Sequence, residues 1–222
     1  MGAARTAAAR ERLIRRIAKP LVFAASLAPL AWLVWLATTG GLGANPIEAC
    51  NRFLGEWALR FLIITLAITP ARIVFGAGPL IRFRRMLGLF AFAYVCLHLT
   101  SYVVLDQFFD WGEIWADIVK RNFITVGMIG FVLLVPLAAT STNAMVRRLG
   151  GRRWRNLHRL VYVTGVAGVV HFYMMVKADV REPLVYAAIV AVLLGFRIVY
   201  ASRRRLAKGR GAQASAPTPK TP

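Results

Sequence analysis

The stretch LGLFAFAYVCLHLTSYVVL (residues 87–105) is apolar along almost its whole length, yet it holds a histidine at position 98. A run of this length matches the roughly 17–25 residues that a helix needs to cross a bilayer. An ionisable side chain inside such a helix is costly unless something compensates it, so it is a functional-site candidate by default. This stretch therefore predicts a membrane-spanning helix that carries a functional histidine.

Five other apolar windows of similar length occur along the chain. They lie at about 20–38, 57–75, 123–140, 157–176 and 184–200. The chain is 58% hydrophobic and its mean hydropathy is +0.58, which is typical of a polytopic membrane protein. We therefore predict an all-α integral membrane protein with six spanning helices in one bundle at 20–201. A basic arm (1–19) precedes the bundle, and a disordered tail (202–222) follows it.

The net charge of +20 is divided unevenly between the two predicted sides of the membrane. The N-terminal arm, the 71–86 loop, the 141–159 segment and the C-terminal part from Arg197 onward together hold 23 of the 29 basic residues, whereas the remaining loops hold eight of the nine acidic ones. The positive-inside rule then places both termini in the cytoplasm. Membrane topology and anionic lipid headgroups account for this pattern, so it gives no reason to expect a nucleic-acid partner.

The chain has three histidines, which are His98, His158 and His171. Counted from the basic ends of their helices, His98 lies about 18 Å along and His171 about 21 Å along, at 1.5 Å per residue. Matched depth on two helices suits the two axial ligands of one haem, because imidazole binds haem iron well inside a helical bundle. A hydrogen-bonded packing role stays open for each of them.

His158 differs because it lies at the inner membrane boundary, beside Arg155 and Arg159. In one straight helix, His158 and His171 would point about 220° apart and lie roughly 20 Å from each other. They would then be unable to bind the same haem. The alternative for His158 is a headgroup anchor, with Trp154 in the aromatic belt.

Six motifs follow one another along the chain. They are GLGANPIE (41–48), WALRFLIITLAITPAR (57–72), RRMLGLFAFAYVCLH (84–98), KRNFITVG (120–127), PLAATS (136–141) and RRLGGRRWRNLHRLVYV (147–163), with His171 after them. Over roughly residues 20–200, this ordered set resembles the haem-binding membrane subunits of bacterial periplasmic methionine sulfoxide reductase systems. Those subunits belong to the ferric-reductase-like transmembrane superfamily.

The resemblance implies a multi-pass protein of the bacterial inner membrane that binds b-type haem, with FMN in some descriptions. It implies electron flow from the quinone pool or a cytosolic flavin reductase to a periplasmic molybdopterin enzyme. That enzyme would pair with this chain as a heterodimer and would reduce methionine sulfoxide in proteins. The haem-associated histidines of the family fall on His98, His158 and His171.

One departure from the superfamily limits the haem count. Two-haem ferric reductases carry two ligands on each of two helices, but here Arg85 stands 13 residues before His98, where a second ligand would be expected. We therefore expect one bis-histidine haem, bound by His98 and His171. A second haem or a flavin near His158, Arg155 and Arg159 would need a non-histidine ligand or none, and a quinone is the other candidate there.

The sequence thus predicts an electron-transfer subunit with no evident substrate chemistry of its own. Two other classes stay open. A self-contained ferric or quinone reductase would need an acceptor site on this chain. A non-redox transporter or assembly factor would use the histidines for packing, although a transporter more often shows broken midplane helices or paired repeats, and neither is evident in the sequence.

Overall fold

The computed structural model describes residues 9, 11–176 and 178–214, and every regular element within these ranges is helical. The longer helices are α2 (Lys19–Thr38), α3 (Pro46–Val74), α4 (Arg84–Ser101), α6 (Asn122–Ala139), α8 (Leu160–Met175) and α9 (Arg181–Ala214). The shorter elements are η1 (Ile14–Ala18), η2 (Gly78–Arg82), η3 (Tyr102–Asp106), α5 (Trp111–Lys120) and α7 (Asn143–Leu157).

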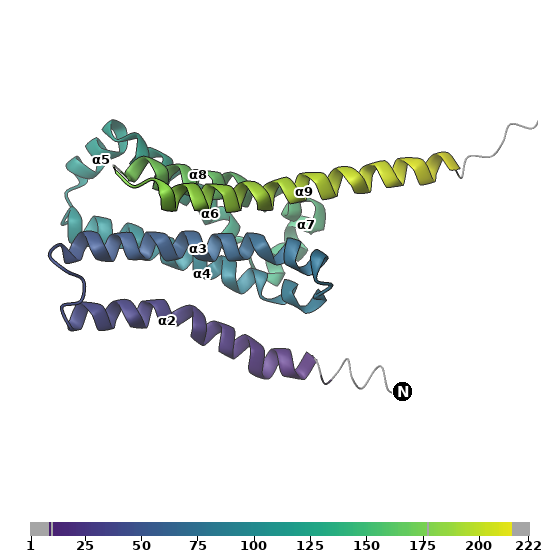
Figure 1. Ribbon diagram of the computed structural model, residues 1–222, viewed down its shortest axis with the longest axis horizontal. Helices are drawn as coiled ribbons and strands as arrows, with labels where there is room; N and C mark the ends of the chain where they lie inside the picture. Colours follow the sequence, from purple (N-terminus) through teal and green to yellow (C-terminus); the bar gives the residue numbers. More distant parts are fainter. Residues whose placement is uncertain (1–8, 10, 177, 215–222) are drawn as a thin grey trace, which may run out of the picture.

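The longer helices run back and forth between the two ends of a single bundle (Figure 1). One end carries α5, and the other carries α7 together with the start of α2 and the end of α9. Five helical stretches are long and apolar enough to cross a membrane, namely Glu11–Thr38, Pro46–Val74, Arg84–Asp106, Asn122–Ala139 and Arg181–Ala207. The predicted all-α, multi-pass architecture is confirmed. The apolar α8 has only 16 residues, so its crossing as a sixth span stays a prediction.

Several helices are longer than the apolar windows. α3 begins at Pro46, well before residue 57, because Asn45 caps it: the Asn45 side chain accepts from the Glu48 N–H at 3.3 Å and donates to its carboxylate at 2.9 Å. The helix leading into α2 starts at Glu11, within the predicted arm. α9 continues to Ala214, so the predicted boundary at residue 201 falls inside a helix, whereas 215–222 lie outside the described residues.

The core is formed mainly where α3 packs along α4. Phe61 of α3 lies 5.1 Å from the Tyr94 ring of α4, measured between ring centroids, and both side chains are buried. Ala91 of α4 is fully buried, which lets the two helices approach closely. This packing holds α3 and α4 in one orientation, and the site described below depends on it.

The Tyr94 hydroxyl contacts the backbone of α2 beside Pro29. It accepts from the Leu30 N–H at 3.2 Å and donates to the Ser26 carbonyl at 2.9 Å. In a regular helix the Leu30 N–H would donate to that same carbonyl. A proline inside a helix disturbs this ladder and bends the helix, and α2 is visibly bent in Figure 1. Tyr94 therefore supplies partners for backbone groups that Pro29 disturbs.

We expect Tyr94→Phe to destabilise the folded protein by about 2 kcal/mol, because two buried hydrogen bonds are lost while the ring packing is kept. Thermal unfolding of the detergent-purified protein would measure the change. The control is Tyr173→Phe on α8, where the side chain is 49% exposed. An equal shift for the two variants would contradict the bridging role of Tyr94.

A second proline leaves a backbone acceptor free in α3. Pro70 has no N–H, so the Leu66 carbonyl lacks its usual partner within the helix. Arg197 of α9 donates to this carbonyl, and it also donates to the Tyr162 hydroxyl of α8 at 3.2 Å. One intramembrane arginine thereby joins three helices of the bundle.

Candidate cofactor site

Two of the three histidines face one another inside the bundle. His98 comes from α4 and His171 from α8, and their ring centroids lie 6.2 Å apart with the ring planes at 77°. The sequence predicts that these two residues lie at similar depth in the membrane. In the structure, the two helices also turn the rings toward each other.

Each ring is oriented by a backbone carbonyl of a neighbouring helix. The His98 Nδ1 lies 2.9 Å from the Asn51 carbonyl oxygen of α3, and the His171 Nδ1 lies 2.6 Å from the Phe123 carbonyl oxygen of α6. A carbonyl oxygen can only accept, so each Nδ1 carries the hydrogen. Each Nε2 is then left with a free lone pair, which is the state in which imidazole binds a metal.

A glycine makes room for each of these ring–carbonyl contacts. A Cβ atom added to Gly55 would lie 3.1 Å from Nδ1 and Cε1 of His98, and one added to Gly127 would lie 2.9 Å from Nδ1 of His171. Gly55 follows Asn51 by four residues, and Gly127 follows Phe123 by four. In a helix, the side chain at position i+4 lies next to the carbonyl of residue i. The two glycines therefore expose the two carbonyls to the rings.

Asn51 also ties α3 to α4 at the level of His98. Its side-chain amide donates to the Ser101 hydroxyl at 2.9 Å and to the His98 carbonyl at 3.2 Å. The Ser101 hydroxyl donates to that same carbonyl at 2.8 Å. These bonds hold the backbone that carries His98.

The paired rings fit a metal held between two imidazoles. Two imidazole nitrogens on opposite sides of one ion, each about 2 Å from it, lie about 4 Å apart. Each ring centroid lies about 1 Å behind its nitrogen, so a centroid separation of about 6 Å is expected. The observed separation is 6.2 Å. Among the described residues, no group of three or more His, Cys, Asp or Glu side chains could hold a metal. Two axial ligands fit haem, whose macrocycle supplies the other ligands of its iron.

His158 lies between two helices and not within the helix that carries His171, where the sequence predicted it. It is the residue that ends α7, and α8 begins only at Leu160. The prediction that His158 and His171 share one straight helix is therefore wrong, because the chain turns between α7 and α8, and the phase angle derived from it does not apply. Along α8, His171 lies about 17 Å from its first residue, so the two histidines remain well separated.

Polar and aromatic contacts hold the His158 ring. Its Nε2 lies 3.1 Å from the Thr140 hydroxyl, and the ring stacks on Trp154 at 3.9 Å between centroids. Trp154 donates from its indole nitrogen to the Thr140 carbonyl at 2.9 Å. Burial lowers the pKa of His158 below its usual value, and the positive charges of Arg84 and Arg85 lower it further. His158 is therefore neutral near pH 7.

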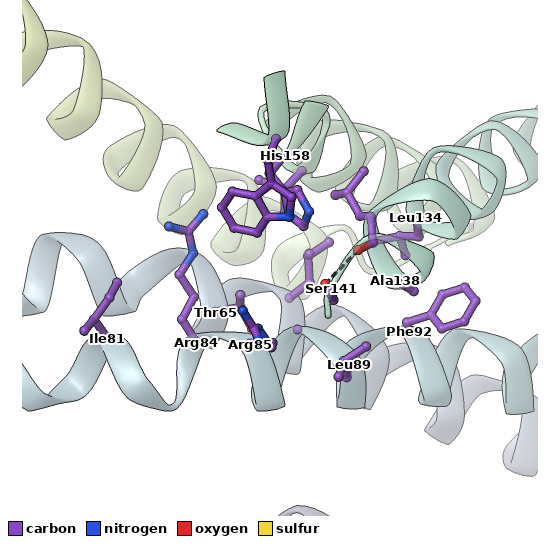
Figure 2. Close-up of a pocket in the computed structure, with 15 residues that line it drawn as sticks. Thr65, Ile81, Arg84, Arg85, Leu89, Phe92, Leu134, Ala138, Ser141 and His158 are labelled. Carbon is purple, nitrogen blue, oxygen red and sulfur yellow. Dashed lines mark hydrogen bonds between the residues drawn. The ribbon is translucent and has the colours of Figure 1, made fainter. Parts of the chain in front are cut away.

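His158 lines a cavity of about 280 Å³ between α4, α6, α7 and α8. Arg84 and Arg85 line the same cavity from the α4 side, as Figure 2 shows. Arg155 and Arg159, which the sequence analysis placed with His158, are exposed and do not line it. The sequence shows that both groups of arginines lie near this end of the bundle. Which of their side chains point into the cavity depends on how the helices pack.

The sequence of this chain matches one family model and several named relatives. Residues 54–169 match the family model described as ferric reductase like transmembrane component. The relatives that carry the name protein-methionine-sulfoxide reductase heme-binding subunit MsrQ include proteins of three bacteria. That of Rhodospirillum rubrum is 61% identical over 190 residues, which cover 86% of this chain and 91% of the relative.

The other two relatives come from Caulobacter vibrioides and Herminiimonas arsenicoxydans. The first is 55% identical over 188 residues, covering 85% of this chain and 89% of the relative. The second is 52% identical over 189 residues, covering 84% and 87%. The region that matches the family model includes Gly55, His98, Gly127 and His158, and His171 lies two residues beyond its end. This chain therefore belongs to the MsrQ family of ferric-reductase-like transmembrane proteins.

Proposed function

We propose that this chain is the membrane electron-transfer subunit of a methionine sulfoxide reductase system and holds one b-type haem between His98 and His171. The facing pair of imidazoles carries the proposal, because each Nδ1 donates to a carbonyl and each Nε2 is free. The relatives named above as heme-binding subunits of a protein-methionine-sulfoxide reductase support it.

The residues of the chain prepare the site for one-electron transfer. His98 and His171 would hold the haem iron through their imidazole nitrogens, which would suit electron transfer and would leave the iron closed to a substrate. The Asn51 and Phe123 carbonyls orient the rings and raise their basicity. Bound haem would supply the iron that changes oxidation state. The surrounding apolar helices exclude water, so little reorganisation accompanies the change in charge.

The charge pattern supports six spans with both termini in the cytoplasm of a bacterium, in its inner membrane. Basic side chains crowd the end of the bundle that carries α7, where the helix contains Arg147, Arg148, Arg152 and Arg153. The opposite end carries α5, with Asp110, Glu113 and Asp117. The positive-inside rule makes the α7 end cytoplasmic. The α5 end would then face a periplasmic, molybdopterin-containing catalytic subunit and form a heterodimer with it.

Electron input would occur at the cytoplasmic end. The cavity beside His158 offers a neutral imidazole, a stacked indole and two guanidinium groups. These groups suit the aromatic ring and the anionic group of FMN or a second haem, or the carbonyl oxygens of a quinone. Arg155 and Arg159 would form an exposed rim for a cytosolic flavin reductase or for lipid headgroups.

The optical spectrum and haem-to-protein ratio of the purified chain test the proposal. A reduced b-type α-band with at least one haem per chain is the expected result. A colourless preparation from haem-replete cells would favour a transporter or assembly factor instead. Turnover with ferric chelates or quinones in the absence of a partner would favour a self-contained reductase.

We expect His158→Ala to keep the haem between His98 and His171 but to slow its reduction from the cytoplasmic side roughly tenfold, since changes next to a cofactor commonly have effects of 10–100-fold. Stopped-flow reduction by a flavin reductase or a quinol would measure this. The matched control is Arg147→Gln on the exposed part of α7. Unchanged kinetics in His158→Ala would remove His158 from the electron path.

A further inference from the structure

A larger cleft lies between α2 and α4, next to the His158 cavity, with which it shares Arg85 and Leu89. Its volume is about 1190 Å³. One wall comes from η1 and the first half of α2, and the other from η2 and α4. This volume exceeds the range of roughly 300–1,000 Å³ that is typical of sites for small ligands.

The bend in α2 explains why the cleft exists. Phe23 meets Phe90 edge-on at 5.2 Å, and the Tyr94 hydroxyl contacts α2 at Ser26 and Leu30. N-terminal to these contacts, α2 diverges from the rest of the bundle (Figure 1). Over the whole helical stretch Glu11–Thr38, only 17% of the most apolar window is buried. Pro29 and Tyr94 thus hold the helix in a shape that leaves η1 and the first turn of α2 apart from α4.

The cleft is cationic at one end. Arg15 and Lys19 line it from the α2 side, and Arg82 and Arg85 line it from the other. Among the described lining residues Glu11 is the one carboxylate, and it pairs with Arg15 at 2.7 Å and also with Arg82. Four cations and one anion leave a net charge of +3. These groups come from η1, η2 and the first residues of α2 and α4, at the end of the bundle that also carries α7. The orientation proposed above puts this end at the level of the lipid headgroups.

The rest of the cleft is apolar and extends toward the membrane interior. Phe23 lines it on α2, and Leu89 and Ala93 line it on α4. Ala93 lies eight residues beyond Arg85, or about 12 Å along the helix, which is a large part of one leaflet of a hydrocarbon core about 30 Å thick. A ligand that fills the whole cleft has an anionic head and a long apolar tail.

We propose that this cleft binds one anionic phospholipid, with its phosphate among Arg15, Lys19, Arg82 and Arg85. One acyl chain then lies along Phe23, Leu89 and Ala93. The neutral head of a quinone would gain nothing from the net charge of +3, and an apolar helix of another protein would leave that net charge uncompensated. Basic clefts between spanning helices are suited to anionic lipid headgroups.

Retention of defined lipids tests the proposal. The full chain is purified in mild detergent and titrated with phosphatidylglycerol or with phosphatidylcholine of the same acyl chains, and bound lipid is counted by native mass spectrometry. Each basic side chain near the surface contributes a factor of about five to binding an anionic lipid. The Arg15→Gln/Lys19→Gln double variant is therefore expected to bind phosphatidylglycerol about 25-fold more weakly, with phosphatidylcholine unchanged.

Two further variants make the test specific. Arg147→Gln/Arg148→Gln removes the same charge from exposed positions outside the cleft and is expected to change nothing. Ala93→Phe fills the apolar part without changing charge and is expected to reduce retention of phosphatidylglycerol. Arg15 and Lys19 do not line the His158 cavity, so their replacement leaves the proposed haem chemistry intact.

Three results would overturn the proposal. The first is equal retention of the two lipids by the unmodified chain. The second is an equal loss of phosphatidylglycerol from the two double variants, which would indicate a general surface-charge effect. The third is one-for-one displacement of phosphatidylglycerol by a long-chain quinone, which would make the cleft a quinone site.

Discussion

His98→Ala and His171→Ala are each expected to abolish the low-spin b-type haem spectrum of the purified protein. The two rings lie 6.2 Å apart between centroids, so each would supply one axial ligand, and no third histidine is near enough to replace either of them. Iron left with a single axial imidazole becomes high-spin or the haem is lost. Optical spectra of the oxidised and reduced protein, with the haem-to-protein ratio, measure both outcomes.

His158→Ala is the matched control, because it removes the remaining histidine from the opposite end of α8. It should keep the low-spin spectrum in full. A full low-spin spectrum in both His98→Ala and His171→Ala would show that the ligand assignment is wrong. It would leave the histidines with a packing role.

Gly127→Ala is expected to weaken haem retention at least tenfold, in line with the 10–100-fold cost of disturbing groups that orient a metal ligand. The added Cβ would lie 2.9 Å from Nδ1 and 3.0 Å from Cε1 of His171, so the ring must move off the Phe123 carbonyl. Haem titration of the apoprotein, followed by its spectrum, measures the affinity and the spin state.

Gly130→Ala on the same helix is the control, since its Cβ would meet the Ala167 side chain at an ordinary 3.7 Å. Gly55→Ala is expected to have a milder effect than Gly127→Ala, because its shortest contact with His98 is 3.1 Å. If Gly127→Ala retains haem as well as Gly130→Ala does, the glycine contact is not needed to orient His171.

Hydropathy located the spanning helices well but located their ends poorly. The window at 57–75 covers the second part of α3 and runs one residue past its end, yet α3 begins at Pro46, because a capping asparagine and an N-terminal proline extend it through polar residues. α9 likewise continues past residue 201 through basic residues. A hydropathy window responds to the apolar membrane interior, whereas capping and local propensity decide where a helix ends.

In the candidate site, too, the sequence identified some of the residues and missed others. The sequence singled out His98, His158 and His171, but it gave no reason to choose Gly55 and Gly127, since a glycine four residues after a carbonyl matters only when another helix presents a ring there. It also grouped His158 with Arg155 and Arg159, whereas Arg84 and Arg85 line its cavity. Arg155 and Arg159 are exposed outside this cavity, and which basic side chains line it depends on how the helices pack.

The sequence by itself determined the membrane class, the charge asymmetry and the matched depth of His98 and His171. Depth follows from a constant rise of 1.5 Å per residue, and charge asymmetry follows from where the charged residues stand along the chain, so neither needs knowledge of a neighbouring helix. Only the tertiary structure decided that the two rings face each other, that carbonyls of α3 and α6 orient them, and that α2 bends away to open a cleft. Those features depend on how each helix is rotated about its axis, which packing between helices determines.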